Sequence, residues 1–281
     1  MTQFDNEDSR TLGLRQIAMK LKRHGVGGTF RYIHTVGIGG ITARIRYYLS
    51  LWRMNRVNRN FDAEHNVDTW AGQSSRQLGI ESESAADREI YVPVPQQSFR
   101  FVMDRLHAAG VELSSYTFVD YGSGKGKAVF LAAEFPFSRI IGVEFSDALH
   151  DSAVENLQNF RSGNQRCSKI RFIHEDATTF SLPDSACLLF FYSPFYGPVM
   201  QQVLDRIERS FASNPRPLVV CFVDDDDGDT KGLNAFATAL GQWDFVQRMP
   251  NFVLPADAGA IAPLMVACWT NQQNSNQDSR G

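Results

Sequence analysis

From residue 116 onward, the apolar positions alternate between two spacings. Short runs rich in β-branched and aromatic residues indicate strands, and segments with the spacing of amphipathic helices lie between them. The expected strands cover residues 116–121, 139–145, 169–174, 186–192, 217–223, 245–252 and 261–270. The expected helices cover residues 97–109, 127–135, 147–160, 198–212 and 230–240. Strand–helix units closed by two successive strands predict an α/β fold, with an open, mostly parallel sheet of seven strands, helices on both faces and a C-terminal antiparallel hairpin.

A different organisation precedes this region. Residues 12–23 and 41–58 have helical spacing, and the second segment carries an apolar stripe at Ile41, Ile45, Tyr48, Leu49 and Trp52. Residues 71–89 are rich in Ser, Gly and acidic residues, which is typical of a linker. We therefore predict a basic helical extension and linker over residues 1–88, an α/β domain over 89–271 and a disordered polar tail over 272–281.

The composition, 43% hydrophobic and 21% charged, is ordinary for a globular protein with a large core. The four cysteines stand far apart without CxxC spacing, which indicates reduced thiols. No apolar run reaches the roughly 18 residues of a transmembrane helix. The acidic first residues lead into no apolar segment, so no secretory signal is expected. The predicted location is cytoplasmic.

Charge is unevenly distributed. Residues 10–60 contain eleven Lys or Arg and no Asp or Glu, although the whole chain carries a net charge of −3. This basic arm predicts an anionic partner, either nucleic acid contacted through phosphates and stacking or a membrane surface. A third interpretation is that the apolar stripe packs on the chain's own domain, where the arginines pair with its acidic residues.

The strongest motif is a glycine-rich turn between an expected strand and an expected helix. Residues 118–127 read Phe-Val-Asp-Tyr-Gly-Ser-Gly-Lys-Gly-Lys, which places Gly122, Ser123, Gly124 and Gly126 in the turn. Glycine permits positive φ and close approach of a ligand to the backbone, and the helix N-terminus offers N–H groups. The spacing excludes a P-loop, and Lys127 replaces the last glycine of a dinucleotide fingerprint. The GxGxG form fits S-adenosylmethionine (SAM), whose amino-acid end is zwitterionic and which has no pyrophosphate.

Acidic residues follow three successive expected strands. Asp120 is placed to meet an ammonium group, and Glu144, 22 residues after Gly122, is placed to bind ribose hydroxyls. Asp176 and Ala177 follow the third strand, where Asp176 is placed to accept from an adenine amino group. All of them are expected at the carboxyl edge of the sheet, the usual ligand edge of open α/β folds. NAD binding and purely structural carboxylates remain as alternatives.

The stretch 118–144 resembles motifs I and II of class I SAM-dependent methyltransferases. It most resembles the branch of the Dot1-like protein-lysine methyltransferases and related bacterial proteins of unknown substrate. Residues 61–69 are similar to a segment preceding the domain in those bacterial relatives, and Tyr91-Val92-Pro93 resembles a loop that covers the cofactor in this branch. The resemblance implies a Rossmann-like fold, SAM as cofactor and methyl transfer, and it leaves the substrate open.

The fourth expected strand leads into Ser193-Pro194-Phe195-Tyr196. This run is similar to the Asp/Asn/Ser-Pro-Pro-aromatic motif of amino-group methyltransferases, but Phe195 replaces the second proline, which argues against an exocyclic base amine as substrate. Tyr91, Ser193 and Tyr196 are the candidates for the acceptor side. In the alternative interpretation, the strand end simply packs its aromatic rings into the core.

An acidic run, Asp224 to Asp227 with Asp229, follows the fifth expected strand. Two interpretations stay open: a solvated loop, or recognition of a basic substrate. An EF-hand register would place Thr230 where glycine is needed and Phe236 where glutamate is needed, so no calcium or other metal site is expected.

Together these features predict a SAM-dependent methyltransferase acting on a nitrogen, with a protein lysine as the favoured acceptor. One alternative is a methyltransferase for small molecules or nucleic acid. Another is a nucleic-acid or membrane-surface binding protein with a vestigial SAM fold. The positive charge of the basic arm is the observation that favours this alternative.

Overall fold

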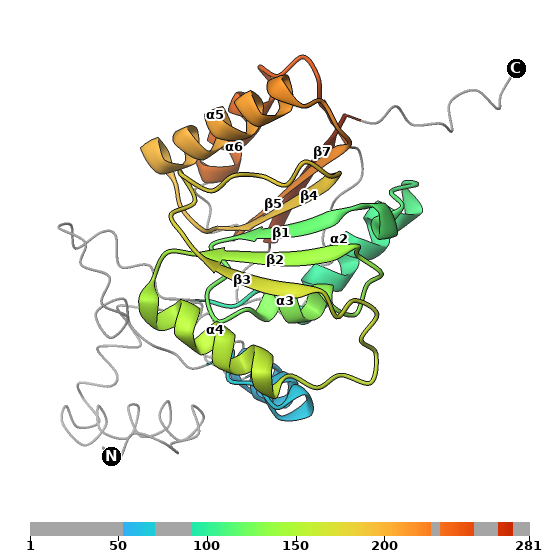
Figure 1. Ribbon diagram of the computed structural model, residues 1–281, viewed down its shortest axis with the longest axis vertical. Helices are drawn as coiled ribbons and strands as arrows, with labels where there is room; N and C mark the ends of the chain where they lie inside the picture. The colour runs from blue at the N-terminus through green and yellow to red at the C-terminus, as the bar shows by residue number, and fades with distance from the viewer. Residues whose placement is uncertain (1–52, 71–91, 226–230, 250–263, 272–281) are drawn as a thin grey trace, which may run out of the picture.

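The computed structural model describes residues 53–70, 92–225, 231–249 and 264–271, which form an α/β fold around one sheet (Figure 1). The sheet has seven strands in the order β3-β2-β1-β4-β5-β7-β6. The strands are β1 (Thr117–Tyr121), β2 (Arg139–Glu144), β3 (Ile170–His174), β4 (Cys187–Tyr192), β5 (Leu218–Asp225), β6 (Gln247–Arg248) and β7 (Leu264–Thr270). Neighbouring strands from β3 to β5 are parallel, while β7 is antiparallel to both β5 and β6. The predicted fold class is confirmed.

Helices cover both faces of this sheet. They are α2 (Gln96–Ala108), α3 (Lys127–Ala132), α4 (Asp147–Asn159), α5 (Gly197–Ser213) and α6 (Lys231–Leu240), with a short 3-10 turn at Leu113–Ser115. Figure 1 shows α5 and α6 on one side of the strands and α2, α3 and α4 on the other. Parallel strands require such crossover helices, so each face of the sheet is covered and its apolar side chains are removed from water.

Alternation along the strands divides the core into two layers. Phe118 and Leu188 pack with α2 and α3, whereas the next residues, Val119 and Leu189, pack with α5 and α6. Successive side chains of a strand point to opposite faces, so a strand buried on both faces must be apolar at consecutive positions. This is why the strands appear in the sequence as continuous apolar runs.

Several element boundaries differ from the sequence prediction, among them β6, which begins at Gln247 instead of residue 245, and α3, which ends at Ala132 instead of residue 135. Two further differences change the interpretation. Strand β5 continues to Asp225 and therefore includes the first two aspartates of the acidic run, which we expected to follow a strand ending at residue 223. The second N-terminal helix continues through residue 65 instead of ending at residue 58. It stops at Asn66, whose φ of 56° is the left-handed conformation common just after helices.

The helix over residues 53–65 is part of the domain's core. Its buried positions Met54, Asn58, Phe61 and His65 recur at helical spacing, while Arg53, Arg56 and Arg59 are exposed. Phe61 packs in the same core layer as α2 and α3, and the His65 ring stacks between Phe61 and Phe160. For these residues, the basic extension thus packs on its own domain.

Residues 1–52, 71–91 and 272–281 lie outside the described residues. This applies to the expected helix 12–23, to the apolar stripe from Ile41 to Trp52, to the linker 71–89 and to the tail 272–281. The domain limits and the anionic partner of residues 10–60 therefore stay predictions. Cys167, Cys187, Cys221 and Cys268 are all buried and free. Among the described helices, none combines the length and the apolar character that crossing a bilayer requires.

Lys127, the first residue of α3, ties the helix over residues 53–65 to the sheet. Its side chain is almost completely buried, its ammonium donates to the Asn58 amide oxygen, and it lies 4.8 Å from the centroid of the Phe61 ring. Burial lowers the pKa of Lys127 to about 8. A buried ammonium is tolerated only where such partners replace water, so the hydrogen bond to Asn58 offsets part of the desolvation cost of the Lys127 ammonium.

Asn58→Ala is therefore expected to lower the free energy of unfolding by about 2 kcal/mol at pH 7, because Lys127 loses its acceptor. In the double variant Asn58→Ala/Lys127→Met the loss should be clearly smaller than the sum of the two single losses. Urea unfolding measures all four proteins, and Asn60→Ala, on an exposed position of the same helix, is the control. Additive losses would show that the two side chains are not coupled.

Candidate active site

The glycine-rich turn joins β1 to α3 at the carboxyl edge of the sheet. The backbone N–H groups of Gly122 and Ser123 both donate to the carbonyl of Val143 at 3.0 Å, which holds the turn against β2. Gly122, Gly124 and Gly126 all have positive φ, between 52° and 92°. A side chain is excluded at two of them by close neighbours as well as by conformation: a Cβ on Gly122 would lie 2.7 Å from Pro194, and one on Gly126 would lie 2.5 Å from Phe172.

Two buried carboxylates flank this turn. Asp120 (3% exposed) is in β1, and Glu144 (4% exposed) ends the neighbouring strand β2. Glu144 accepts from the N–H of Gly124 through one oxygen and from the N–H of Ser146 through the other, both at 2.9 Å. Burial, and then repulsion by Glu144, raises the pKa of Asp120 to about 8, and burial raises the pKa of Glu144. This pairing of acids favours a cationic ligand, which would relieve the repulsion.

Two buried hydroxyls beside Glu144 have no hydrogen-bond partner among the described residues. They belong to Ser123, in the glycine turn, and to Ser146, just before α4. Buried hydroxyls are normally paired, and an unpaired one in a native structure calls for an explanation such as a missing ligand. With the turn that admits no Cβ, these hydroxyls and carboxylates fit a polar ligand that has an ammonium group and vicinal hydroxyls. Ser146 could not be identified from the sequence, because nothing in its local pattern distinguishes it from an ordinary helix-capping serine.

The run after β4 lies next to the glycine turn. Tyr121 and Phe191 are opposite each other in the sheet with stacked rings, and the near contact of Gly122 with Pro194 follows directly beyond this pair. Ser193, with a φ of 40°, is one of two described non-glycine residues with positive φ. Backbone strain of this kind gathers at functional sites, where the surrounding structure holds it in place.

Asp224 joins this run from β5, so the interpretation of the acidic run as a solvated loop does not apply to this residue. The side chain is 5% exposed, and one of its oxygens accepts from the hydroxyls of Ser193 and Tyr196 at 2.7 and 2.8 Å. Because β4 and β5 are parallel neighbours, their carboxyl ends coincide, and the backbone N–H of Ser193 donates to Val223. The sequence did contain a signal for Asp224. It is the first aspartate after an apolar run, and the carboxyl ends of parallel strands, including the one that precedes Ser193, meet at one edge of the sheet.

The predicted adenine-binding residues lie one strand further out. Asp176 and Ala177 follow β3, which pairs with β2 so that His174 is opposite Glu144. The Asp176 carboxylate is exposed and accepts at 2.7 Å from both the N–H and the hydroxyl of Thr178. The structure thus places Asp176 on the same edge of the sheet, with no described contact to the glycine turn. Tyr91 lies outside the described residues, so its role stays a prediction.

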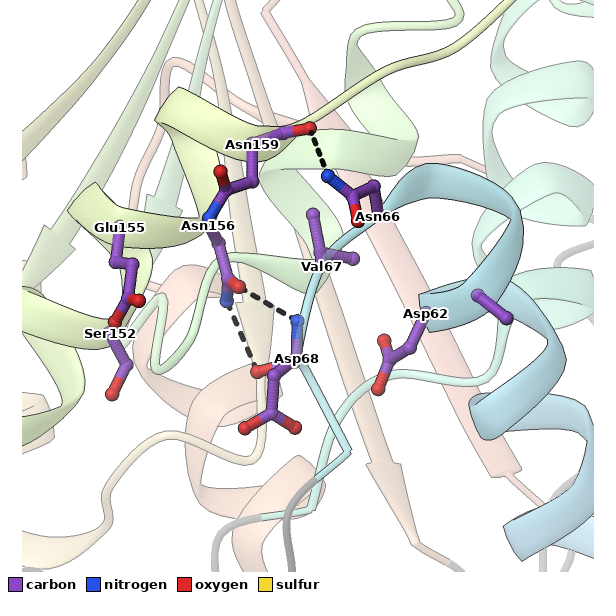
Figure 2. Close-up of a pocket in the computed structure, with 9 residues that line it drawn as sticks. Asp62, Asn66, Val67, Asp68, Ser152, Glu155, Asn156 and Asn159 are labelled. Carbon is purple, nitrogen blue, oxygen red and sulfur yellow. Dashed lines mark hydrogen bonds between the residues drawn. The ribbon is translucent and has the colours of Figure 1, made fainter.

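Asn156, on α4, fastens the segment after the first helix to the glycine turn. Its amide accepts from the N–H of Asp68 at 2.7 Å and donates at 3.1 Å to the carbonyls of Asp68 and of Lys125. Figure 2 shows the two bonds between Asn156 and Asp68. The Lys125 ammonium, almost fully buried, lies 3.4 Å from the Asp68 carboxylate. The role of Asn156 could not be identified from the sequence, because its partners are 88 and 31 residues away in the chain.

A polar pocket of about 390 Å³ opens beside this connection, between α4 and the 62–68 segment. Figure 2 shows its lining residues, among them Asp62, Ser152 and Glu155. The glycine turn, Asp120 and Glu144 do not line it, so this pocket is separate from the candidate active site. The described residues contain no group of three or more His, Cys, Asp or Glu side chains placed to hold a metal ion.

Solved structures with a similar fold include several methyltransferases. The methyltransferase domain of bacterial CtHen1 is 15% identical over 62% of this chain and 98% of its own, with a TM-score of 0.45. Magnesium protoporphyrin IX methyltransferase from Synechocystis PCC 6803, solved with bound SAM, is 16% identical over 63% and 79%, with a TM-score of 0.44. The ribosomal protein L11 methylase from Lactobacillus delbrueckii subsp. bulgaricus is 14% identical over 69% and 91%, with a TM-score of 0.43.

No protein-family model matches the sequence, and no curated protein matches it either. At TM-scores below 0.5 the structural similarities do not assign a function to this chain. The assignment has to come from the side chains at the carboxyl edge of the sheet.

Proposed function

We propose that this chain is a class I SAM-dependent methyltransferase. The observation that carries the proposal is the pair of buried carboxylates, Asp120 and Glu144, on either side of a glycine turn that admits no side chain. Two unpaired buried hydroxyls beside them supply further hydrogen-bonding capacity. SAM matches this site because it combines an ammonium, a sulfonium and a ribose diol and lacks a phosphate. The seven-stranded sheet with its antiparallel last strands is the architecture that the resemblance of residues 118–144 to these enzymes implies.

Each residue has a binding role in this proposal. Asp120 holds the ammonium end of SAM, and Glu144 exchanges its present N–H donors for the ribose hydroxyls. Gly122, Ser123, Gly124 and Gly126 let the ligand approach the backbone, while Asp176 and Ala177 bind the adenine. When bound, SAM supplies a methyl group that is already activated. The chain therefore contributes mainly orientation and exclusion of water.

For the acceptor we favour a nitrogen, and among nitrogens the side chain of a protein lysine. The support is the run from Ser193 to Tyr196, which brings two hydroxyls onto Asp224, places Pro194 against the glycine turn and is similar to the motif of amino-group methyltransferases. A lysine must lose a proton before it can attack, and the hydroxyl and carboxylate oxygens at this edge favour an N–H donor. Tyr91, Ser193 and Tyr196 are the residues we assign to the acceptor side. Small molecules and nucleic acids are the alternative acceptors.

Calorimetric titration with SAM and with S-adenosylhomocysteine tests the cofactor site. We expect both ligands to bind the wild-type chain. Glu144→Ala removes a charged hydrogen-bond partner and Gly124→Arg fills the space of the turn, so each variant should bind with an affinity about 100-fold or more lower. Glu208→Ala, an exposed glutamate of α5, should bind as the wild type does. Absence of binding to the wild type, or binding that neither variant weakens, would refute the proposal.

The acceptor class is tested by incubating the purified protein with radiolabelled SAM and a lysate from cells that lack it. We expect the label in the protein fraction, as acid-stable methyl-lysine after hydrolysis. Label in nucleic acid or in the small-molecule fraction would replace the lysine assignment and leave the SAM site intact.

A further inference from the structure

The carboxylate of Asp224 receives both hydroxyl protons of the acceptor side. The hydroxyl of Ser193 donates to Asp224 Oδ1 at 2.7 Å, and the hydroxyl of Tyr196 donates to the same oxygen at 2.8 Å. The carbonyl of Val223, also in β5, lies 3.3 Å from the Ser193 hydroxyl and is a second possible acceptor for that proton. In either case the Ser193 proton points to β5.

A hydroxyl has one proton and two lone pairs. Once Ser193 and Tyr196 have committed their protons to β5, each presents only lone pairs to any further partner. The surface they form can therefore accept hydrogen bonds and cannot donate them. A carboxylate or phosphate placed there would meet lone pairs, whereas an amine or ammonium would meet acceptors with which its N–H groups can pair.

The position of this surface relates it to the cofactor site. Pro194 lies against Gly122, so the run cannot move away from the glycine turn without opening a gap there. The Ser193 backbone is held by the bond from its N–H to the Val223 carbonyl at 3.0 Å. Tyr196 is 41% exposed and so is accessible to an incoming molecule, while Asp224 behind it is buried.

We propose that Asp224 is a positioning residue that fixes Ser193 and Tyr196 as hydrogen-bond acceptors and thereby selects a methyl acceptor that donates hydrogen bonds, such as an amine. The inference rests on the proposed function and narrows it, because it excludes carboxylate, phosphate and carbonyl oxygens at the reacting position. Asp224 does not itself touch the reacting atoms. It acts by setting the direction of two hydroxyl protons.

The probe is a pair of cofactor analogues that differ at one position. S-adenosylhomocysteine has a sulfur there, and sinefungin has a carbon that bears an amino group directed to where the methyl group would leave. The ratio of their dissociation constants isolates the interaction of one amine with the acceptor side. We expect wild-type protein to bind sinefungin at least about ten-fold more tightly, the effect of one or two charge-assisted hydrogen bonds.

Asp224→Asn keeps the shape of the side chain but gives it N–H donors, so the two hydroxyls no longer have to point toward it. In this variant the ratio should fall to about one, with S-adenosylhomocysteine still bound. The double variant Ser193→Ala/Tyr196→Phe should lose the preference as well, which covers the case in which Asp224→Asn does not fold. Asp104→Asn, an exposed aspartate of α2, is the matched control and should keep the wild-type ratio.

The outcomes distinguish a failure of the SAM site from a failure of the role assigned to Asp224. If S-adenosylhomocysteine does not bind the wild type, the proposed function fails, and this inference fails with it. If it binds but sinefungin is not preferred, or if the preference survives in both variants, the SAM site stands and the role of Asp224 is overturned.

Discussion

Asp120→Asn is expected to bind S-adenosylhomocysteine about 100-fold or more weakly than the wild type, and yet to be the more stable protein above pH 8. The first effect follows because an amide cannot balance the charge of the ligand's ammonium group at this buried position. The second follows because the substitution removes one member of a buried pair of acids. A single change that weakens binding while it strengthens the fold is the mark of a site arranged for a cationic ligand.

The direction of the pH dependence follows from the raised pKa. An unfolded aspartate titrates at roughly 4, whereas Asp120 in the folded protein has a pKa of about 8. Between these values the folded state keeps a proton that the unfolded chain releases, so the wild type loses stability as the pH rises and regains none above pH 8. The asparagine variant has no such proton, and above pH 8 its free energy of unfolding should exceed that of the wild type by a few kcal/mol.

Urea unfolding at pH 6 and pH 8.5 measures this advantage, and Asp104→Asn serves as the control. Titration calorimetry in two buffers of different ionisation enthalpy adds a second readout. Near pH 7, binding of S-adenosylhomocysteine to the wild type should release close to one proton, since the ligand's ammonium favours the charged form of Asp120. A variant less stable than the wild type at both pH values, or one that binds the ligand equally well, would contradict this account.

Gly126→Ala is expected to lower the free energy of unfolding by about 3 kcal/mol, the largest stability loss we expect from adding one methyl group. Two effects combine at this position. The φ of 92° is one that a side chain opposes, and the new Cβ would lie 2.5 Å from Phe172 and 3.0 Å from Phe130. Both rings are packed in the core and have little room to move.

Two other glycines separate these effects. Gly110 has a φ of 87° with nothing within 4 Å of an added Cβ, so Gly110→Ala reports the backbone conformation alone, about 1 kcal/mol. Gly163 has open space and no positive φ, so Gly163→Ala should be neutral or slightly stabilising. Denaturant midpoints of the three variants give the comparison. Equal losses of stability at Gly126 and Gly110 would mean that the rings of Phe172 and Phe130 can move aside without a loss of free energy.

The order of the elements and the location of the candidate site could be predicted from the sequence, because both depend on local patterns. Apolar runs of strand length and helical spacing between them identify the α/β units, and parallel strands must end at one edge. Asp120, the glycine turn and Glu144 lie at the ends of consecutive strands. They therefore meet in any fold with this connection, and the structure brings all of them together.

The tertiary structure decided what depends on pairing between distant segments. That Asp224 serves Ser193 and Tyr196 follows from the pairing of β4 with β5, and strand order is not encoded in the spacing of apolar residues. The same holds for Asn58 with Lys127, and for Asn156 with Asp68 and Lys125, whose partners lie 31 to 88 residues away. Local periodicity tells which face of an element is buried, but only the packed chain decides which polar group it meets there.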